Sequence, residues 1–366
     1  MESTQRRNAV AVLIACAFLA AVLFVRSSAF GIWDPWELGT ADAARRIANG
    51  ETTPSASAFS TWLVSLGFRL FGVHEWAGRA PIALSGFVAA LVSYVLARRY
   101  AGVRAGVYAL LITAATPLFV LNSSAMLGDA PGFAAQALVL LASAGAILPR
   151  GQASEIADGV RAGWLALLAA SVVLSTLVSG ALLGPLPVLA AAAITLRLHG
   201  PRAMTGSPLA RVSGLAILAA ALVLSLLVVR AIFADATDYS PWLGGTAAAS
   251  KPSTFDAVLE EVFHSFAPWS AILPLAIASA FLRGTGPGSR GQHALSGEHV
   301  ALSSLLVLTA AFGYAAQTLY TSRYGQEVAY LPVVALATLV ALYLREVESR
   351  GDERTREPQW GAGIAA

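Results

Sequence analysis

Long apolar runs recur along the whole chain, separated by short polar segments. Each run has about the length that crosses ~30 Å of hydrocarbon as a helix rising ~1.5 Å per residue. Because lipid offers no hydrogen-bond partner to a backbone amide, every run is expected to be helical. The pattern predicts an all-α polytopic membrane protein with about ten transmembrane helices, at 8–25, 80–97, 105–121, 132–148, 163–179, 181–198, 212–233, 268–282, 299–318 and 328–344.

The composition narrows the class further. Of the 366 residues, 57% are hydrophobic and only 12% are charged, whereas about 25% are charged in an average soluble protein. This excludes a disordered chain, a coiled coil and a DNA-binding domain, and it argues against an ordinary soluble enzyme. The single cysteine, Cys16, excludes a disulfide within the chain and a cysteine metal cluster.

The distribution of the basic residues predicts the orientation. The apolar stretch 58–71 is short and is interrupted by Arg69, so we treat it as a surface helix with an apolar face of Phe59, Trp62, Leu63, Leu66 and Leu70. With the N-terminus in the cytoplasm, sixteen of the 24 Lys and Arg residues then lie inside, as the positive-inside rule expects. The first apolar run is taken as a retained helix rather than a cleaved signal peptide.

This orientation predicts one membrane domain over 1–344 and a cytoplasmic tail over 345–366. The outer loops are 26–79, 122–131, 234–267 and 319–327, and most acidic residues lie in them. Two further amphipathic surface helices are expected there. The first lies within 37–49, with Leu38, Ala41, Ala44 and Ala48 on its apolar face. The second follows Ser253, with Phe255, Val258, Leu259, Val262 and Phe263 on its apolar face.

Six short motifs, in order along the chain, resemble those of polyprenyl-phosphate-dependent glycosyltransferases of the GT-C superfold. These are the family 39 enzymes of the protein O-mannosyltransferase and aminoarabinose transferase kind. The motifs are Trp33-Asp34-Pro35-Trp36-Glu37 with the following Ala44-Arg45, Leu70-Phe71-Gly72 with Arg79 and Pro81, Pro117-Leu118-Phe119 with Asp129, Ser179-Gly180 with Gly184-Pro185, Pro268-Trp269 with Leu273-Pro274, and Tyr330-Leu331-Pro332. The chain departs from the family where Lys-Pro-Pro-Leu is absent and where Ser179 replaces a lysine.

The resemblance implies an inverting transfer of a sugar from a polyprenyl-phosphate donor to an acceptor hydroxyl on a lipid, a glycan or a protein. It implies an active site on the outer face of a membrane, which we take to be the bacterial inner (plasma) membrane, and no nucleic-acid partner. Such a reaction needs a general base for the acceptor hydroxyl and cationic or metal stabilisation for the leaving phosphate. No metal site is assigned and no cofactor is expected with certainty, although a divalent metal ion is compatible with the acids in the loops.

Asp34 and Glu37 are the catalytic candidates. By its position alone Asp34 fits equally the start of the following helix, because Asp before Pro commonly begins one; the resemblance favours the general base. Glu37 is expected to orient the acceptor or to be the base itself. Its alternative is a favourable charge in the first turn of a helix.

The substrate-binding candidates are Asp129, Arg323, Tyr324, Arg79, Arg45 and His264. Asp129 is implied as a second acid that holds the acceptor or a metal, with a helix N-cap as the alternative. Arg323, beside Tyr324, is a candidate for the lipid phosphate, or else an interfacial side chain. For Arg79 and Arg45 the interpretation as structural partners of nearby acids is favoured, and His264 is the weakest candidate.

Two other classes remain open. A transporter or lipid flippase would place ionisable residues in mid-helix and would show paired broken helices. The predicted spans are almost free of charge, and no repeat is visible, which disfavours transport. A non-catalytic relative that acts as a scaffold stays open because the Lys-Pro-Pro-Leu motif is absent.

Overall fold

The computed structural model describes residues 2–25, 27–34, 36–51, 58–127, 129–148, 156–199, 207–233, 255–282, 297–324 and 328–356, and these ranges contain helices and no strand. The prediction of an all-α fold is therefore confirmed. The helices are α1 (Glu2–Phe24), α2 (Leu38–Ala48), α3 (Ala58–Phe71), α4 (Glu75–Ala114), α5 (Pro117–Ser124), α6 (Ala130–Ile147), α7 (Asp158–Leu183), α8 (Pro185–His199), α10 (Pro208–Phe233), α12 (Phe255–Ser265), the 3-10 turn η2 (Trp269–Ala271), α13 (Leu273–Leu282), α14 (Gly297–Tyr324) and α15 (Val333–Arg356).

Six of the described helices are long and apolar enough to cross a membrane, namely α1, α4, α6, α7, α10 and α14. A bent pair, α12 with η2 and α13, would make a seventh, although its two parts meet at 110°. The segment predicted to span at 268–282 is thus a helix of ten residues after a sharp bend. The polytopic class is confirmed, and the count of ten stays a prediction.

Glycines with left-handed backbone conformations break two of the long helices. Within α4, Gly102 has φ 86°, a value that favours glycine because it has no Cβ. The two arms of α4 then fold back on each other, since Ser93 Oγ lies 3.2 Å from Thr113 Oγ1 across the break. The arms and α5 correspond to the predicted spans 80–97 and 105–121. Gly180, with φ 71°, breaks α7 in the same way, just before α8.

The helices approach closely where small residues face large ones. A Cβ on Gly106 would lie 2.8 Å from the Tyr94 ring, and Gly145 leaves room for the indole of Trp164 in the same manner. In a membrane, where burial of apolar surface gives little drive for association, such close packing holds helices together. The most extensive contacts are those of α4 with α15 and of α6 with α7, followed by those of α8 with α14 and of α4 with α6.

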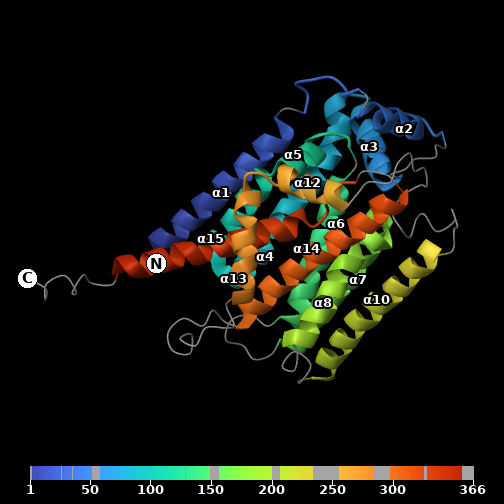
Figure 1. The fold of residues 1–366 in the computed structure, drawn as a ribbon. Helices are drawn as coiled ribbons and strands as arrows, with labels where there is room; N and C mark the ends of the chain where they lie inside the picture. The colour runs from blue at the N-terminus through green and yellow to red at the C-terminus, as the bar shows by residue number, and fades with distance from the viewer. Residues whose placement is uncertain are drawn as a thin grey trace, which may run out of the picture.

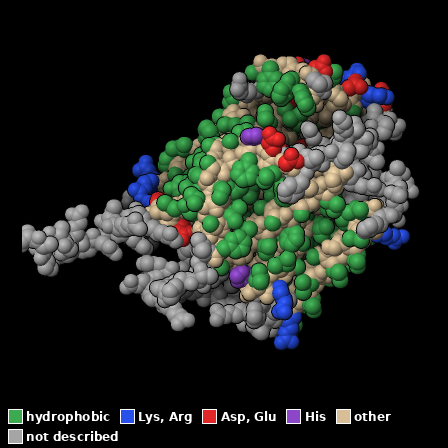
Figure 2. All heavy atoms as spheres, viewed as in Figure 1, with side chains coloured by type: hydrophobic (Ala, Val, Ile, Leu, Met, Phe, Trp, Pro, Cys, Tyr) green, Lys and Arg blue, Asp and Glu red, His purple; other side chains and the backbone are tan. Residues whose placement is uncertain are grey.

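The molecule has two ends. Helices α2 and α3 gather at one of them, at the upper right of Figure 1, whereas α1 begins and α15 ends at the opposite side. The visible surface between is mainly hydrophobic, and charged side chains gather towards its edges (Figure 2). We call the end with α2 and α3 the loop end. At the opposite end Arg104 pairs with Glu348 at 2.5 Å.

Much of the apolar stripe predicted for α3 faces away from the neighbouring helices. Trp62, Leu66 and Leu70 are exposed, whereas the small polar residues Ser60 and Ser65 are buried against neighbouring helices. This arrangement has a physical reason: lipid is a good solvent for apolar side chains, and small polar residues allow close helix packing. Helix α12 behaves partly in the same way, and α2 buries part of its predicted apolar face while Leu38 stays exposed. In α12 Val258 and Val262 are buried, as is Phe266 directly after it, and Leu259 and Phe263 are exposed; in α2 Ala41 and Ala44 are buried.

Candidate functional site

Three segments that are far apart in the sequence meet at the loop end. The first runs from Ser27 to Glu37, between α1 and α2. The second runs from Met126 to Asp129, between α5 and α6. The third is the stretch from Val328 to Tyr330 that precedes α15. Hydrogen bonds join the first to the second and the second to the third.

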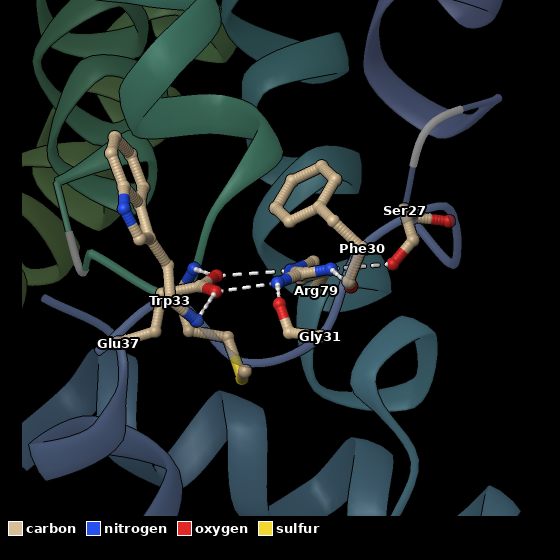
Figure 3. Close-up of polar contacts among 7 residues, drawn as sticks. Ser27, Phe30, Gly31, Trp33, Glu37 and Arg79 are labelled. Atoms are coloured by element: carbon tan, nitrogen blue, oxygen red, sulfur yellow. Dashed lines mark hydrogen bonds and ion pairs between the residues drawn. The ribbon is translucent and has the colours of Figure 1, made fainter. Parts of the chain in front are cut away.

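A buried ion pair lies at the centre of this arrangement. The side chains of Arg79 and Glu37 are both 0% exposed, and Arg79 Nη2 lies 2.5 Å from Glu37 Oε2 while Nε lies 3.0 Å from Oε1 (Figure 3). The other three donor hydrogens of Arg79 are taken by backbone carbonyls. Nη1 donates to Ser27 O and Phe30 O at 2.8 and 2.9 Å, and Nη2 donates to Gly31 O at 2.8 Å. All five donors of the guanidinium therefore have partners.

Glu37 is equally well satisfied. Besides Arg79, its carboxylate accepts hydrogen bonds from the Trp33 N–H at 2.9 Å and the Met126 N–H at 2.7 Å. Burial would raise the pKa of Glu37, but the guanidinium and these two N–H groups together hold the pKa below its usual value. Each carboxylate oxygen thus accepts two hydrogen bonds. In this geometry Glu37 clamps the first loop to α4 and to Met126. Its catalytic role stays a prediction.

Asp129 lies three residues beyond Met126, at the start of α6. It occupies the N-cap position, but its side chain makes no cap hydrogen bond. Instead the half-buried carboxylate accepts a hydrogen bond from the Ala329 N–H, and the desolvation raises its pKa to about 6 in spite of that bond. An acid with a perturbed pKa at the junction of three segments is a candidate for function.

Asp34 is exposed, between Trp33 and Trp36, which are 45% and 64% exposed. Trp33, directly before Asp34, is anchored because its N–H donates a hydrogen bond to the carboxylate of the buried Glu37. The Glu37 clamp therefore holds the backbone of the loop while leaving the Asp34 carboxylate accessible. A general base requires this combination of a fixed position and access.

Several other candidates lie in simpler surroundings. Arg45 pairs with Asp42 at 2.8 Å on exposed α2, and His264 lies 3.8 Å from Glu260 on exposed α12. The backbones of Arg323 and Tyr324 form the last turn of α14, and their side chains lie outside the described structure.

Within the described ranges, no group of three or more His, Cys, Asp or Glu side chains has a geometry that could hold a metal ion.

The structure adds contacts that the sequence analysis missed. The backbone N–H groups of Met126 and Ala329 donate hydrogen bonds to the carboxylates of Glu37 and Asp129, and no side-chain pattern reveals a backbone donor. Gln317 was also missed: it is a buried amide in α14 that bonds to Val328 O. The presence of a glutamine inside an apolar span could have identified this position from the sequence, because polar residues are rare there.

Comparison with known proteins agrees with this picture. A model of the dolichyl-phosphate-mannose-protein mannosyltransferase family matches residues 55–225. An uncharacterized protein of Aquifex aeolicus is 31% identical over 103 residues, which cover 25% of this chain and 21% of that protein.

Solved structures show the fold. ArnT from Cupriavidus metallidurans, bound to undecaprenyl phosphate, aligns over 93% of this chain and 61% of its own, with 20% identity and a TM-score of 0.63. The archaeal oligosaccharyltransferase AglB from Archaeoglobus fulgidus, in complex with an inhibitory peptide and a dolichol-phosphate, aligns over 97% of this chain and 52% of its own, with 14% identity and a TM-score of 0.57.

The class follows from these findings. The protein is an integral membrane protein with the fold of ArnT and AglB, and the resemblance to the GT-C superfold that the motifs indicate is confirmed. The chain spans about three fifths of the ArnT chain and about half of the AglB chain.

Proposed function

We propose that this protein is a membrane glycosyltransferase that moves a sugar from a polyprenyl-phosphate donor to an acceptor hydroxyl with inversion at the anomeric carbon. The observation that carries the proposal is the loop end of a GT-C fold, where three segments bring an anchored, accessible Asp34 and a half-buried Asp129 to the same end. ArnT and AglB have been solved with polyprenyl phosphates bound, which supports this class of donor.

In this proposal Asp34 removes the proton from the acceptor hydroxyl as that oxygen attacks the anomeric carbon. The bond from that carbon to the phosphate oxygen breaks on the opposite face, and the polyprenyl phosphate leaves with the electron pair. Asp129, when ionised, accepts a hydrogen bond from the acceptor and orients it. Arg323 lies at the loop end of α14 and is our candidate to stabilise the leaving phosphate.

The test is sugar transfer by the purified protein in liposomes, with a panel of radiolabelled polyprenyl-phosphate sugars and membrane extract as acceptor. Asp34→Asn is expected to abolish transfer while changing the free energy of unfolding by less than about 0.5 kcal/mol, because the residue is exposed. Asp42→Asn, an exposed acid on α2, is the matched control and should keep activity. Full activity of the Asp34 variant would refute the base, and no transfer from any donor by the wild type would refute the function.

We also propose that the loop end faces outward, with both termini in the cytoplasm. The chain offers a clean test, because its single cysteine can be removed by Cys16→Ser. Gly39→Cys at the loop end and Gly159→Cys at the opposite end both place the new side chain in open space. In intact cells a membrane-impermeant maleimide should label only the Gly39 variant. Labelling of only the Gly159 variant would reverse the orientation.

A further inference from the structure

Gln317 is a buried primary amide two turns before the end of the apolar helix α14. Its side chain is 2% exposed, and its Nε2 group donates to two acceptors on different elements. One is Glu261 Oε2 on α12, at 2.8 Å, and the other is Val328 O in the segment before α15, at 2.6 Å. A buried polar group costs stability unless it is hydrogen-bonded. The two bonds satisfy both hydrogens of Nε2 and tie the three elements together, while Oε1 has no hydrogen-bond partner among the described residues.

The Val328 carbonyl and the Ala329 N–H belong to the same peptide group. That group is planar and, in the trans form, directs its C=O and N–H to opposite sides. On one side it accepts the hydrogen bond from Gln317, and on the other it donates to the carboxylate of Asp129. Fixing the carbonyl therefore fixes the direction of the N–H that Asp129 receives.

We propose that Gln317 is a positioning residue for Asp129, acting through the Val328–Ala329 peptide group, and that Glu261 holds Gln317 in place. This inference rests on the proposed function, in which Asp129 orients the acceptor. It assigns a role to α12 as well: the surface helix is connected to the candidate site by one continuous chain of hydrogen bonds. Polarisation along such a chain strengthens each of its bonds.

The consequence is a change in the ionisation of Asp129. The Ala329 N–H favours the charged carboxylate and opposes the desolvation that raises its pKa. If the peptide group is free to rotate, that support is weakened and the pKa rises above its value of about 6. Three other charged groups are connected to this region. Glu37 accepts a hydrogen bond from the Met126 N–H and pairs with Arg79, and Glu261 accepts a hydrogen bond from Gln317.

The variant that tests the inference is Gln317→Met, which keeps the length of the side chain and removes both hydrogen bonds. Gln136→Met is its matched control. Gln136 is also 2% exposed in an apolar helix, and its Nε2 also donates to two acceptors, Leu183 O and Gly184 O. The two variants are expected to lose similar stability, but only Gln317 is connected to Asp129.

The first measurement is the pH profile of sugar transfer. With Gln317→Met the acidic limb is expected to move upward by about one pH unit, because a hydrogen bond to a charged group has roughly that weight. The rate at pH about 6 then falls roughly fivefold more than the rate at pH about 8.5. The conservative Glu261→Gln, which keeps an acceptor for Gln317, should retain most of the wild-type profile. An unmoved acidic limb in Gln317→Met would overturn the inference.

A second measurement does not need activity. The difference in unfolding free energy between a protein and its Asp129→Asn counterpart, followed against pH, reports the pKa of Asp129. That pKa is expected to be higher in the Gln317→Met background and unchanged in the Gln136→Met background. Equal values in the two backgrounds would refute the positioning role even if no sugar donor is found. Should Gln317→Met fail to fold, Glu261→Ala on the surface helix tests the same chain of bonds.

Discussion

The sharpest consequence of the structure concerns the buried pair of Glu37 and Arg79. The substitution Glu37→Gln keeps the size of the side chain, removes its charge and replaces one acceptor oxygen by an NH₂ group. In the wild-type protein each carboxylate oxygen of Glu37 accepts two hydrogen bonds. In the variant at least two donors therefore lose their acceptor and face the NH₂ group, which is itself a donor. Because no water replaces them in this fully buried position, the loss is expected to appear in full.

The magnitude follows from the count of bonds. A hydrogen bond to a charged group contributes about 1.5–3 kcal/mol, so two such bonds predict a loss of about 3–6 kcal/mol. Breaking a buried ion pair by removing one partner costs about 3–5 kcal/mol, which agrees with that range. We therefore expect Glu37→Gln to lower the free energy of unfolding by about 3–5 kcal/mol.

The assay is reversible unfolding of the purified protein in mixed micelles, with denaturing detergent as the variable. Glu51→Gln is the control, since Glu51 pairs with Arg46 at 2.8 Å in the same region but both side chains are about half exposed. That variant should lose no more than about 1 kcal/mol. Comparable small losses in both variants would refute the interpretation of Glu37 as a structural clamp.

Three further predictions test other parts of the molecule. Asp129 has a raised pKa, so the stability it contributes when protonated is lost as the pH rises through about 6. Asp129→Asn should therefore stabilise the protein at pH about 8 by roughly 1–3 kcal/mol and have no effect near pH 4. A loss of stability at the higher pH would contradict the raised pKa. Gly86→Val would push its side chain into Ser123, and unfolding measurements should show a loss of about 1–3 kcal/mol or more; an unchanged stability would show that α4 and α5 are packed less closely. Arg104→Ala removes an exposed ion pair with Glu348, and Glu348 still pairs with Arg345 in the variant. The same measurement should therefore show a loss of no more than about 1 kcal/mol.

The comparison of pattern and structure is clearest for the helices outside the long spans. Periodicity located α2, α3 and α12 within a few residues. It did not determine which side of α3 packs inward, because an apolar stripe is equally stable against lipid and against protein. Only the neighbouring helices, which bury Ser60 and Ser65 and leave Trp62 outside, decided this.

The candidate site divides in the same way. Asp34 and Asp129 could be named as candidates from the sequence, because the family resemblance favoured a chemical role over a helix start at both positions, and these roles stay predictions. The roles of Glu37 and Arg79 could not be assigned, because the sequence left several pairings open for Arg79. The structure selected Glu37, 42 residues away, by burying both side chains together.

The sequence by itself determined that this is a helical membrane protein with few charges, and that its acids gather in a small number of loops. These properties are local, since they follow from the hydropathy of each segment and from the cost of exposing a backbone amide to lipid. Only the tertiary structure decided which acid is enclosed and which is free. The carboxylates of Glu37 and Asp129 accept hydrogen bonds from the N–H groups of Met126 and Ala329, which lie 89 and 200 residues further along the chain. Hydrogen bonds to backbone groups carry no side-chain signature, so they become visible only when the fold brings these segments together.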